Sequence, residues 1–166
     1  LTTENYTQKL YGFKWYKGIE FENTDIGSSI NENSYIGRMA CTRFLDRPFM
    51  LTEYAHSPYN RYVHEAALMM GAYAALQGWD ILIPHSDLVR NFYVPLDSYS
   101  FASAANPVTK AEEVISFFAW FRGDVKTALH SVEFNVSDEK IMSKNTLNAI
   151  SPEYGKIFML TKIGNS

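Results

Sequence analysis

Two apolar runs flank a helical stretch and together decide the fold: Phe-Met-Leu-Thr-Glu-Tyr at residues 49–54 and Ile-Leu-Ile-Pro-His-Ser-Asp at residues 81–87. Pro48 ends the preceding segment. Residues 49–52 show no helical period, which is typical of a strand buried on both faces. The first run stops at Glu53, where the strand is expected to leave the core, and residues 81–83 are a second run of the same kind.

The stretch between these runs, residues 62–77, predicts a helix. Its apolar residues recur at helical spacing: Val63, Ala66, Ala67, Met70 and Ala74. Gly78 follows directly and is a plausible helix stop. Strand, helix and strand in this order make one βαβ unit, for which a parallel sheet is the expected setting.

The same ordered series resembles the end of a clan A glycoside hydrolase barrel. Besides residues 48–54, the resemblance rests on the loop His56-Ser57-Pro58-Tyr59-Asn60, on Glu65 and on residues 72–80, and it is clearest over residues 36–128. In that clan of (β/α)8 enzymes, the Glu that closes the seventh strand is the nucleophile of a retaining mechanism. The resemblance therefore implies that Glu53 is a catalytic nucleophile.

The expected fold class is α/β: the C-terminal portion of a (β/α)8 TIM barrel, from about helix six to helix eight, followed by short β-strands. The chain has 166 residues, whereas a complete barrel typically needs about 250. Residues 1–129 are expected to form the partial barrel segment. Residues 130–166 are expected to begin a C-terminal β accessory region.

The flanking helices are predicted from their periodicity. Residues 35–45 place Ile36, Met39, Ala40 and Phe44 on one face. Asn106 followed by Pro107 predicts a helix start, and Gly123 predicts the end of that helix. The apolar stripe of this last helix comprises Ala111, Val114, Ile115, Phe118 and Phe121.

The C-terminal region changes pattern. Val132, Phe134 and Val136 alternate with polar residues, as on a half-exposed strand. Residues 156–163 are a second strand candidate.

A retaining glycosidase needs a second carboxyl group, about 5–5.5 Å from the nucleophile, to protonate the leaving oxygen. The clan supplies it from an Asn-Glu pair at the end of strand four. Asn31-Glu32 is such a pair, but residues 27–30 before it have the composition of a loop. We therefore expect the acid/base residue to come from a segment not in this chain.

Other side chains around the expected site follow from the resemblance. It places His56, Asn60, His85, Asp87 and Tyr54 near the substrate, with Tyr93, Tyr99 and Phe101 as weaker candidates for the rim. Clan members commonly have a Trp platform at the end of strand eight, where this chain has Ile83-Pro84-His85. The alternatives are that the histidines are satisfied within their own loops and that Glu53 caps a helix or pairs with an Arg such as Arg47 or Arg61.

Composition excludes several other classes of protein. The net charge of −3 and pI near 5.8 argue against a nucleic-acid surface. Cys41 is the single cysteine, so no intrachain disulfide can form. No apolar run is long enough for a membrane span, and residues 1–5 do not have the pattern of a signal peptide. The aromatic content of 15% fits a ring-rich core, sugar-stacking platforms, or both.

No cofactor and no metal are expected. His64-Glu65 lacks the second His that a zinc-binding helix carries four residues later, and His56, His64 and His85 have no recognised ligand spacing.

The function implied by the resemblance is hydrolysis of O-glycosidic bonds in a β-linked oligo- or polysaccharide, with retention of configuration. The alternative is a non-catalytic carbohydrate-binding or structural barrel remnant, and a third is an unrelated α/β domain with a similar βαβ unit. Both barrel interpretations predict a partner, either the remainder of the barrel in the same polypeptide or a second copy, because a partial barrel exposes strand edges. A polysaccharide substrate would favour a secreted or cell-surface location.

Overall fold

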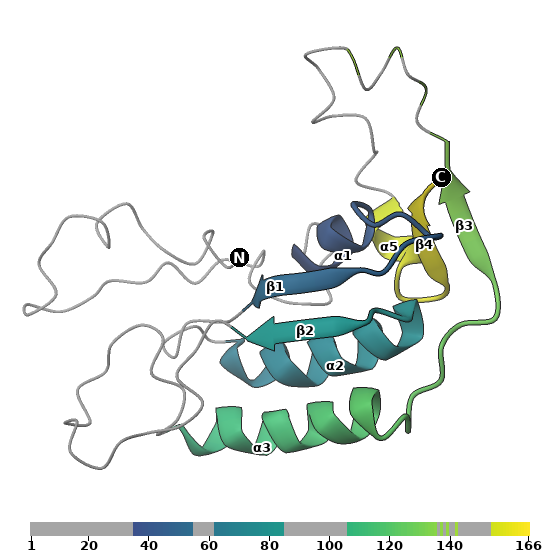
Figure 1. Cartoon of the computed structure of the whole chain (residues 1–166). Helices are drawn as coiled ribbons and strands as arrows, with labels where there is room; N and C mark the ends of the chain where they lie inside the picture. The colour runs from purple at the N-terminus through teal and green to yellow at the C-terminus, as the bar shows by residue number, and fades with distance from the viewer. Residues whose placement is uncertain are drawn as a thin grey trace, which may run out of the picture.

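The computed structural model describes residues 35–54, 62–84, 106–135, 137, 139, 142 and 154–166. These residues contain both helices and strands, with two small parallel sheets. Strand β1 (Met50–Tyr54) pairs with β2 (Ile81–Pro84), and β3 (Ser131–Phe134) pairs with β4 (Lys162–Asn165) (Figure 1).

The chain passes from β1 to β2 through the short 3-10 helix η4 (Val63–Glu65) and helix α2 (Ala66–Gln77). The parallel pairing of β1 with β2 confirms the predicted βαβ unit. Gly78 ends α2 with a φ of 67°, a left-handed conformation that glycine adopts without steric penalty. The predicted inner face is confirmed for Ala66, Ala67, Met70 and Ala74, which are buried, but not for Val63, which lies in η4 and is only half-buried.

Trp79 and Asp80 hold the start of β2 against the start of β1. The Trp79 ring is buried, and its centroid lies 4.9 Å from that of Phe49. The Asp80 Oδ2 atom accepts a hydrogen bond of 2.8 Å from the Phe49 amide. Both side chains therefore stabilise the end of the βαβ unit opposite Glu53.

Helix α1 (Tyr35–Ala40) is shorter than the predicted range of 35–45. After Ala40 the backbone turns to meet β4. The Asn165 side chain donates to the carbonyl oxygens of Cys41 and Arg43, at 2.9 Å and 3.1 Å, and Phe44 forms a parallel bridge with Asn165. These partners replace the hydrogen bonds that would have continued the helix.

The prediction of a strand over residues 156–163 is wrong for residues 156–161. Helix α5 (Tyr154–Ile157) and a turn occupy residues 154–161, and β4 begins only at Lys162. The turn buries Phe158 completely and presents its carbonyl to the side chain of Gln77. Tertiary contacts with α2 therefore override the local β pattern.

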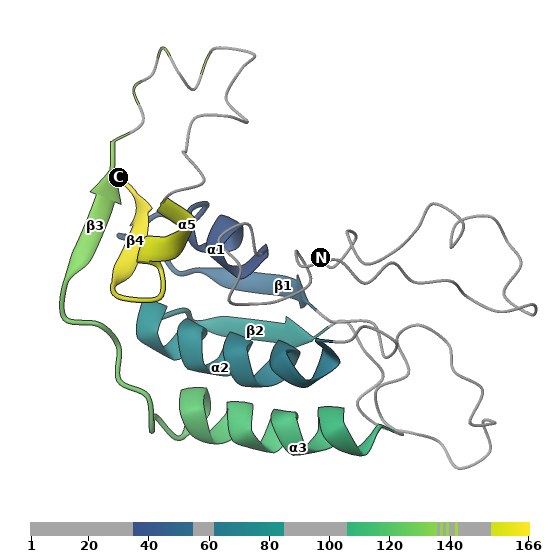
Figure 2. The same ribbon diagram turned by 180° about the vertical axis from the view of Figure 1, so that it is seen from behind.

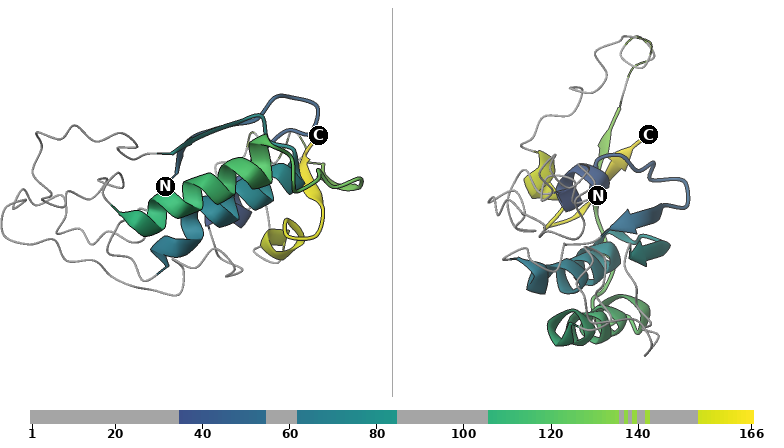
Figure 3. Two further views of the ribbon diagram at one scale, coloured as in Figure 1. Left: turned by 90° about the horizontal axis from the view of Figure 1, so that it is seen from below. Right: turned by 90° about the vertical axis from the view of Figure 1, so that its left-hand side faces the viewer.

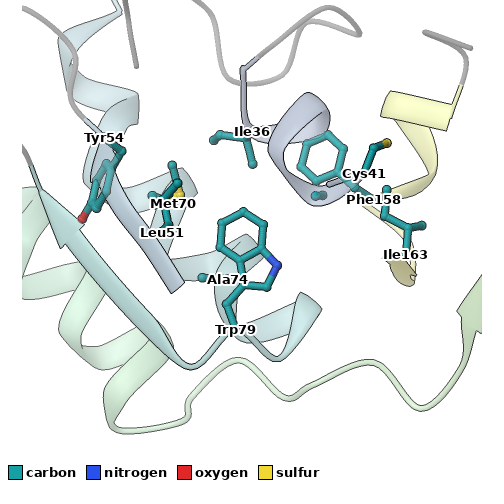
Figure 4. Packing of buried hydrophobic residues seen from close by; sticks show 10 residues of the cluster. Ile36, Cys41, Leu51, Tyr54, Met70, Ala74, Trp79, Phe158 and Ile163 are labelled. Carbon is teal, nitrogen blue, oxygen red and sulfur yellow. The ribbon is translucent and has the colours of Figure 1, made fainter. Parts of the chain in front are cut away.

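The core joins the βαβ unit to the C-terminal residues. Phe158 and Ile163 pack in the same buried cluster as Ile36, Met70 and Trp79 (Figure 4). Residues on both sides of the expected boundary at 129/130 thus contribute to one cluster.

Helix α3 (Pro107–Ser116) continues into η5, a π-helical segment (Phe117–Phe121). The predicted N-cap is confirmed, because Asn106 Oδ1 accepts a hydrogen bond of 3.0 Å from the Val108 amide. The predicted stop at Gly123 follows η5 with a φ of 79°.

The face that α3 and η5 bury is narrow and carries no large apolar side chain. It consists of Glu112, Ser116 and Ala119, and α3 lies alongside α2 on the side away from β1 (Figures 2 and 3). The apolar stripe faces outward instead, and Phe121 is 72% exposed. Its members Val114, Ile115 and Phe118 are exposed as well, and so is Phe117, which was not among the residues of the predicted stripe. An amphipathic helix normally buries its apolar stripe, so this orientation leaves a large uncovered apolar surface.

The sheet also has an uncovered face. Met50, Ile81 and Ile83 are exposed on the first sheet. The expectation of strands buried on both faces is therefore wrong for the residues that the structure describes, where α2 covers one face only.

The single cysteine gives a first prediction. Cys41 is buried beside α1, and burial raises the pKa of its thiol to about 11. Because the thiolate is the reactive form, alkylation by iodoacetamide at pH 8 should be at least about 100-fold slower in the native protein than in urea. Mass spectrometry of timed samples measures both rates. Equal rates would show that the thiol is not buried as described.

Candidate functional site

The candidate site lies where the carboxyl ends of β1 and β2 meet. Because the strands are parallel, both ends lie at the same edge of the sheet, with Tyr54 opposite Pro84 in the register. Glu53 is the penultimate residue of β1. The strand therefore runs one residue beyond Glu53, whereas the sequence predicted that it stops there.

The register of β1 is irregular at this edge. Met50 pairs with Ile81 and Leu51 with Leu82, but the register shifts between Leu51 and Tyr54. Leu51 and Tyr54 are both buried. In a regular strand, side chains alternate between the two faces, so residues at positions i and i+3 would point to opposite faces. Such a bulge changes the direction of a side chain and is frequent beside active sites. Glu53 lies within the irregular part and is half-buried.

Tyr54 lies beneath this edge, in the core. It is 6% exposed, and its pKa is raised to about 12 by burial and, to a smaller degree, by the Glu113 carboxylate. The phenol therefore keeps its proton at any physiological pH and can serve as a hydrogen-bond donor but not as a base.

A buried carboxyl group with a raised pKa lies against the N-terminal end of α2. Glu112 of α3 is 4% exposed, and its Oε2 atom accepts a hydrogen bond of 3.3 Å from the Ala67 amide. Burial raises the pKa of Glu112 to about 7. The Ala67 hydrogen bond opposes that shift, and the carboxylates of Glu65 and Glu113 add to it.

Sequence reasoning did not single out Glu112. Its place in a helix was predicted, but a Glu in a helix is normally exposed. The available signal was weak: positions 112, 116 and 119 share one helical face, and none of them carries a large apolar side chain.

Most of the predicted substrate-binding residues lie outside the described residues. These are His56, Asn60, His85 and Asp87, and the same holds for Glu32 and for the rim candidates Tyr93, Tyr99 and Phe101. Of the expected site, the structure therefore places Glu53 and Tyr54, and it brings them to the edge where Pro84 leads toward His85 in the sequence.

Two further observations concern the described part of the chain only. No group of three or more His, Cys, Asp or Glu side chains is arranged there to hold a metal ion. No helix there has the length and apolar character needed to cross a membrane.

Comparison with protein-family models, with curated proteins and with solved structures finds no match to this chain.

Proposed function

We propose that this chain is the C-terminal part of a (β/α)8 glycoside hydrolase that cleaves β-linked oligo- or polysaccharides with retention of configuration. The observation that carries the proposal is the position of Glu53 at the carboxyl edge of two parallel strands joined by a helix. In (β/α)8 enzymes this edge carries the catalytic residues. The bulge around Glu53 and its half-buried side chain also suit a functional carboxylate.

In the proposed mechanism, the ionised Glu53 carboxylate attacks the anomeric carbon of the bound sugar. The bond from that carbon to the leaving oxygen breaks, and the leaving oxygen takes a proton from the acid/base residue, which a segment outside this chain supplies. Water then attacks the glycosyl-enzyme, with the same residue accepting its proton. His56, Asn60, His85 and Asp87 are proposed to bind sugar hydroxyl groups. The sequence also placed Tyr54 near the substrate, but its side chain is 6% exposed and packs in the core, so we propose that it supports the end of β1 and does not itself bind sugar.

The uncovered apolar surfaces support the partner that this proposal needs. One surface is the open face of the first sheet, with Met50, Ile81 and Ile83, and the other is the outward stripe of α3 and η5. Exposed patches of this kind mark surfaces that pack against other structure. We propose that the remainder of the barrel, in the same polypeptide or in a second copy, covers them.

Covalent trapping tests the role of Glu53. A 2-deoxy-2-fluoro-β-glycoside with a dinitrophenyl leaving group needs little acid assistance, so a chain that lacks the acid/base residue can still be labelled. We expect one adduct per chain, located at Glu53 by peptide mass spectrometry, and no adduct in Glu53→Gln. Glu133→Gln, an exposed change on β3, is the matched control and should be labelled like the wild type.

The trapping experiment also separates the alternatives. Reversible binding of the sugar without an adduct would support a carbohydrate-binding remnant and contradict the enzymatic proposal. With an ordinary aryl glycoside, the chain alone should turn over far below the usual enzymatic range of about 1–10³ per second. Turnover within that range would show that the acid/base residue is present in this chain.

A further inference from the structure

Glu112 makes an unusual connection between two helices. Ala67 is the second residue of α2, and its amide is one of the first-turn donors that have no partner within a helix. The N-cap residue of α2, Glu65, makes no side-chain hydrogen bond to that turn. The acceptor for the Ala67 amide is instead the Oε2 atom of Glu112, a residue of α3 that lies 45 positions away in the sequence.

The second oxygen of the same carboxyl group is the unexplained feature. Glu112 Oε1 is buried and has no hydrogen-bond partner among the described residues. An ionised carboxylate with a buried, unpaired oxygen is strongly unfavourable. A proton on Oε1 removes the charge and leaves Oε2 free to accept from Ala67.

The charged groups around Glu112 disfavour ionisation as well. From η4, Glu65 faces it, and His64 lies 4.0 Å from Glu65. From its own helix, Glu113 adds a second carboxylate, which pairs with Lys110 at 3.0 Å and also lies near Tyr54 of β1.

The remaining elements packed against α3 contribute no compensating charge. Helix α2 has one ionisable side chain, Tyr73, which packs edge-on against Phe158, and η5 has none. Thus no cation pairs with Glu112 among the described residues.

We propose that Glu112 is a proton-dependent lock between α3 and the N-terminal end of α2. When Oε1 carries the proton, the carboxyl group is neutral and holds the Ala67 amide, and the two helices stay together. When the proton leaves, the uncompensated negative charge next to Glu65 and Glu113 drives this end of α2 away from α3. The lock does not depend on the proposed glycosidase activity.

The sign of the pH dependence follows from the elevated pKa of Glu112. The native state holds this proton more tightly than an opened state, in which the ordinary pKa of 4.5 applies. The lock is therefore complete below about pH 4.5, weakens as the pH rises, and is lost as the pH passes about 7. Between pH 5 and pH 8 the opening equilibrium should rise by about 50- to 100-fold and then level off.

NMR of the full chain labelled at the glutamate carboxyl carbons tests the lock. We expect one carboxyl resonance to titrate near pH 7, and the Ala67 amide resonance to follow with the same midpoint. In Glu112→Gln, which keeps an acceptor oxygen without the charge, both titrations should vanish. Glu113→Gln should keep both titrations, and so should His64→Gln, which removes the imidazole next to Glu65.

Hydrogen exchange at Ala67, corrected for its intrinsic pH dependence, gives a second measure. Between pH 5 and pH 8, the protection of the Ala67 amide should fall by about 50- to 100-fold in the wild type and stay constant in Glu112→Gln. If every glutamate titrates below pH 5.5, or if the titration near pH 7 persists in Glu112→Gln, the proposal is wrong. Should that variant not fold, the shared midpoint of the two wild-type resonances still decides, because different midpoints would exclude the lock.

Discussion

Replacement of Gln77 by methionine is expected to lower the free energy of unfolding by about 3–5 kcal/mol. Gln77 is completely buried at the end of α2. Its Nε2 atom donates to the carbonyl oxygens of Phe158 and Thr161, at 2.7 Å and 2.6 Å, and its Oε1 atom accepts from the Ile163 amide at 2.9 Å. Methionine preserves the size of the side chain but leaves three backbone groups without partners.

Urea denaturation followed by tryptophan fluorescence measures this loss. Gln77→Glu is the informative comparison, because it keeps the acceptor for Ile163 but turns a negative oxygen toward two carbonyl groups. We expect it to be at least as destabilising as methionine at pH 8 and to recover part of its stability at pH 5, where a buried carboxyl takes up a proton. If Gln77→Met lowers the free energy of unfolding by less than about 1 kcal/mol, the Gln77 side chain does not hold the C-terminal turn through these hydrogen bonds.

The second large effect is expected at Gly71, in the middle of α2. A Cβ atom at this position would lie 2.2 Å from Ser116 Oγ and 2.7 Å from Ser116 Cα. Alanine is intrinsically favoured over glycine within a helix, by about 1 kcal/mol. The contact between α2 and α3 should reverse that preference, so that Gly71→Ala destabilises the protein by about 2–4 kcal/mol.

Two further variants isolate the cause at Gly71. Ser116→Gly removes the Oγ and Cβ atoms but not the backbone, so the double variant should recover only part of the loss. Gly123→Ala is the control for a glycine whose cost is conformational, because its φ is 79° and nothing closer than 3.9 Å would meet its Cβ. That control should lose only about 1–2 kcal/mol. If Gly71→Ala is neutral or stabilising in thermal unfolding, the helices do not approach as described.

Local sequence patterns predicted the βαβ unit because each of its parts carries its own signal. Period 3.6 marks α2, Gly78 marks its end, and short apolar runs mark β1 and β2. The N-cap at Asn106 is of the same kind, since the capping side chain and the amide it holds are two residues apart. Such features depend on neighbours in sequence and are therefore visible in it.

The features that the sequence did not predict depend on distant partners. The turn before β4 forms because Gln77 binds carbonyl groups more than 80 residues away. The face that α3 buries is set by the close approach of Ser116 to Gly71, and not by its apolar stripe. Periodicity identifies the faces of a helix, but it does not specify which of them a neighbouring helix covers.

The same distinction holds for the candidate site. The position of Glu53 near the end of a parallel strand followed from the pattern alone, but the bulge around it did not. The raised pKa of Glu112 arises first from its burial and to a smaller degree from the carboxylate of Glu65 in η4, neither of which its own helix reveals in the sequence. The functions proposed for His56, Asn60, His85 and Asp87 stay predictions.

The position of Phe158 and Ile163 in the central cluster has a consequence for biosynthesis. Both residues are made late, whereas Ile36, Met70 and Trp79, which they cover, are made much earlier. Translation proceeds at about 5–20 residues per second. The side chains of Met70 and Trp79 therefore stay exposed for several seconds before Phe158 and Ile163 are synthesised. That interval is the time in which a chaperone that recognises apolar segments would find this nascent chain.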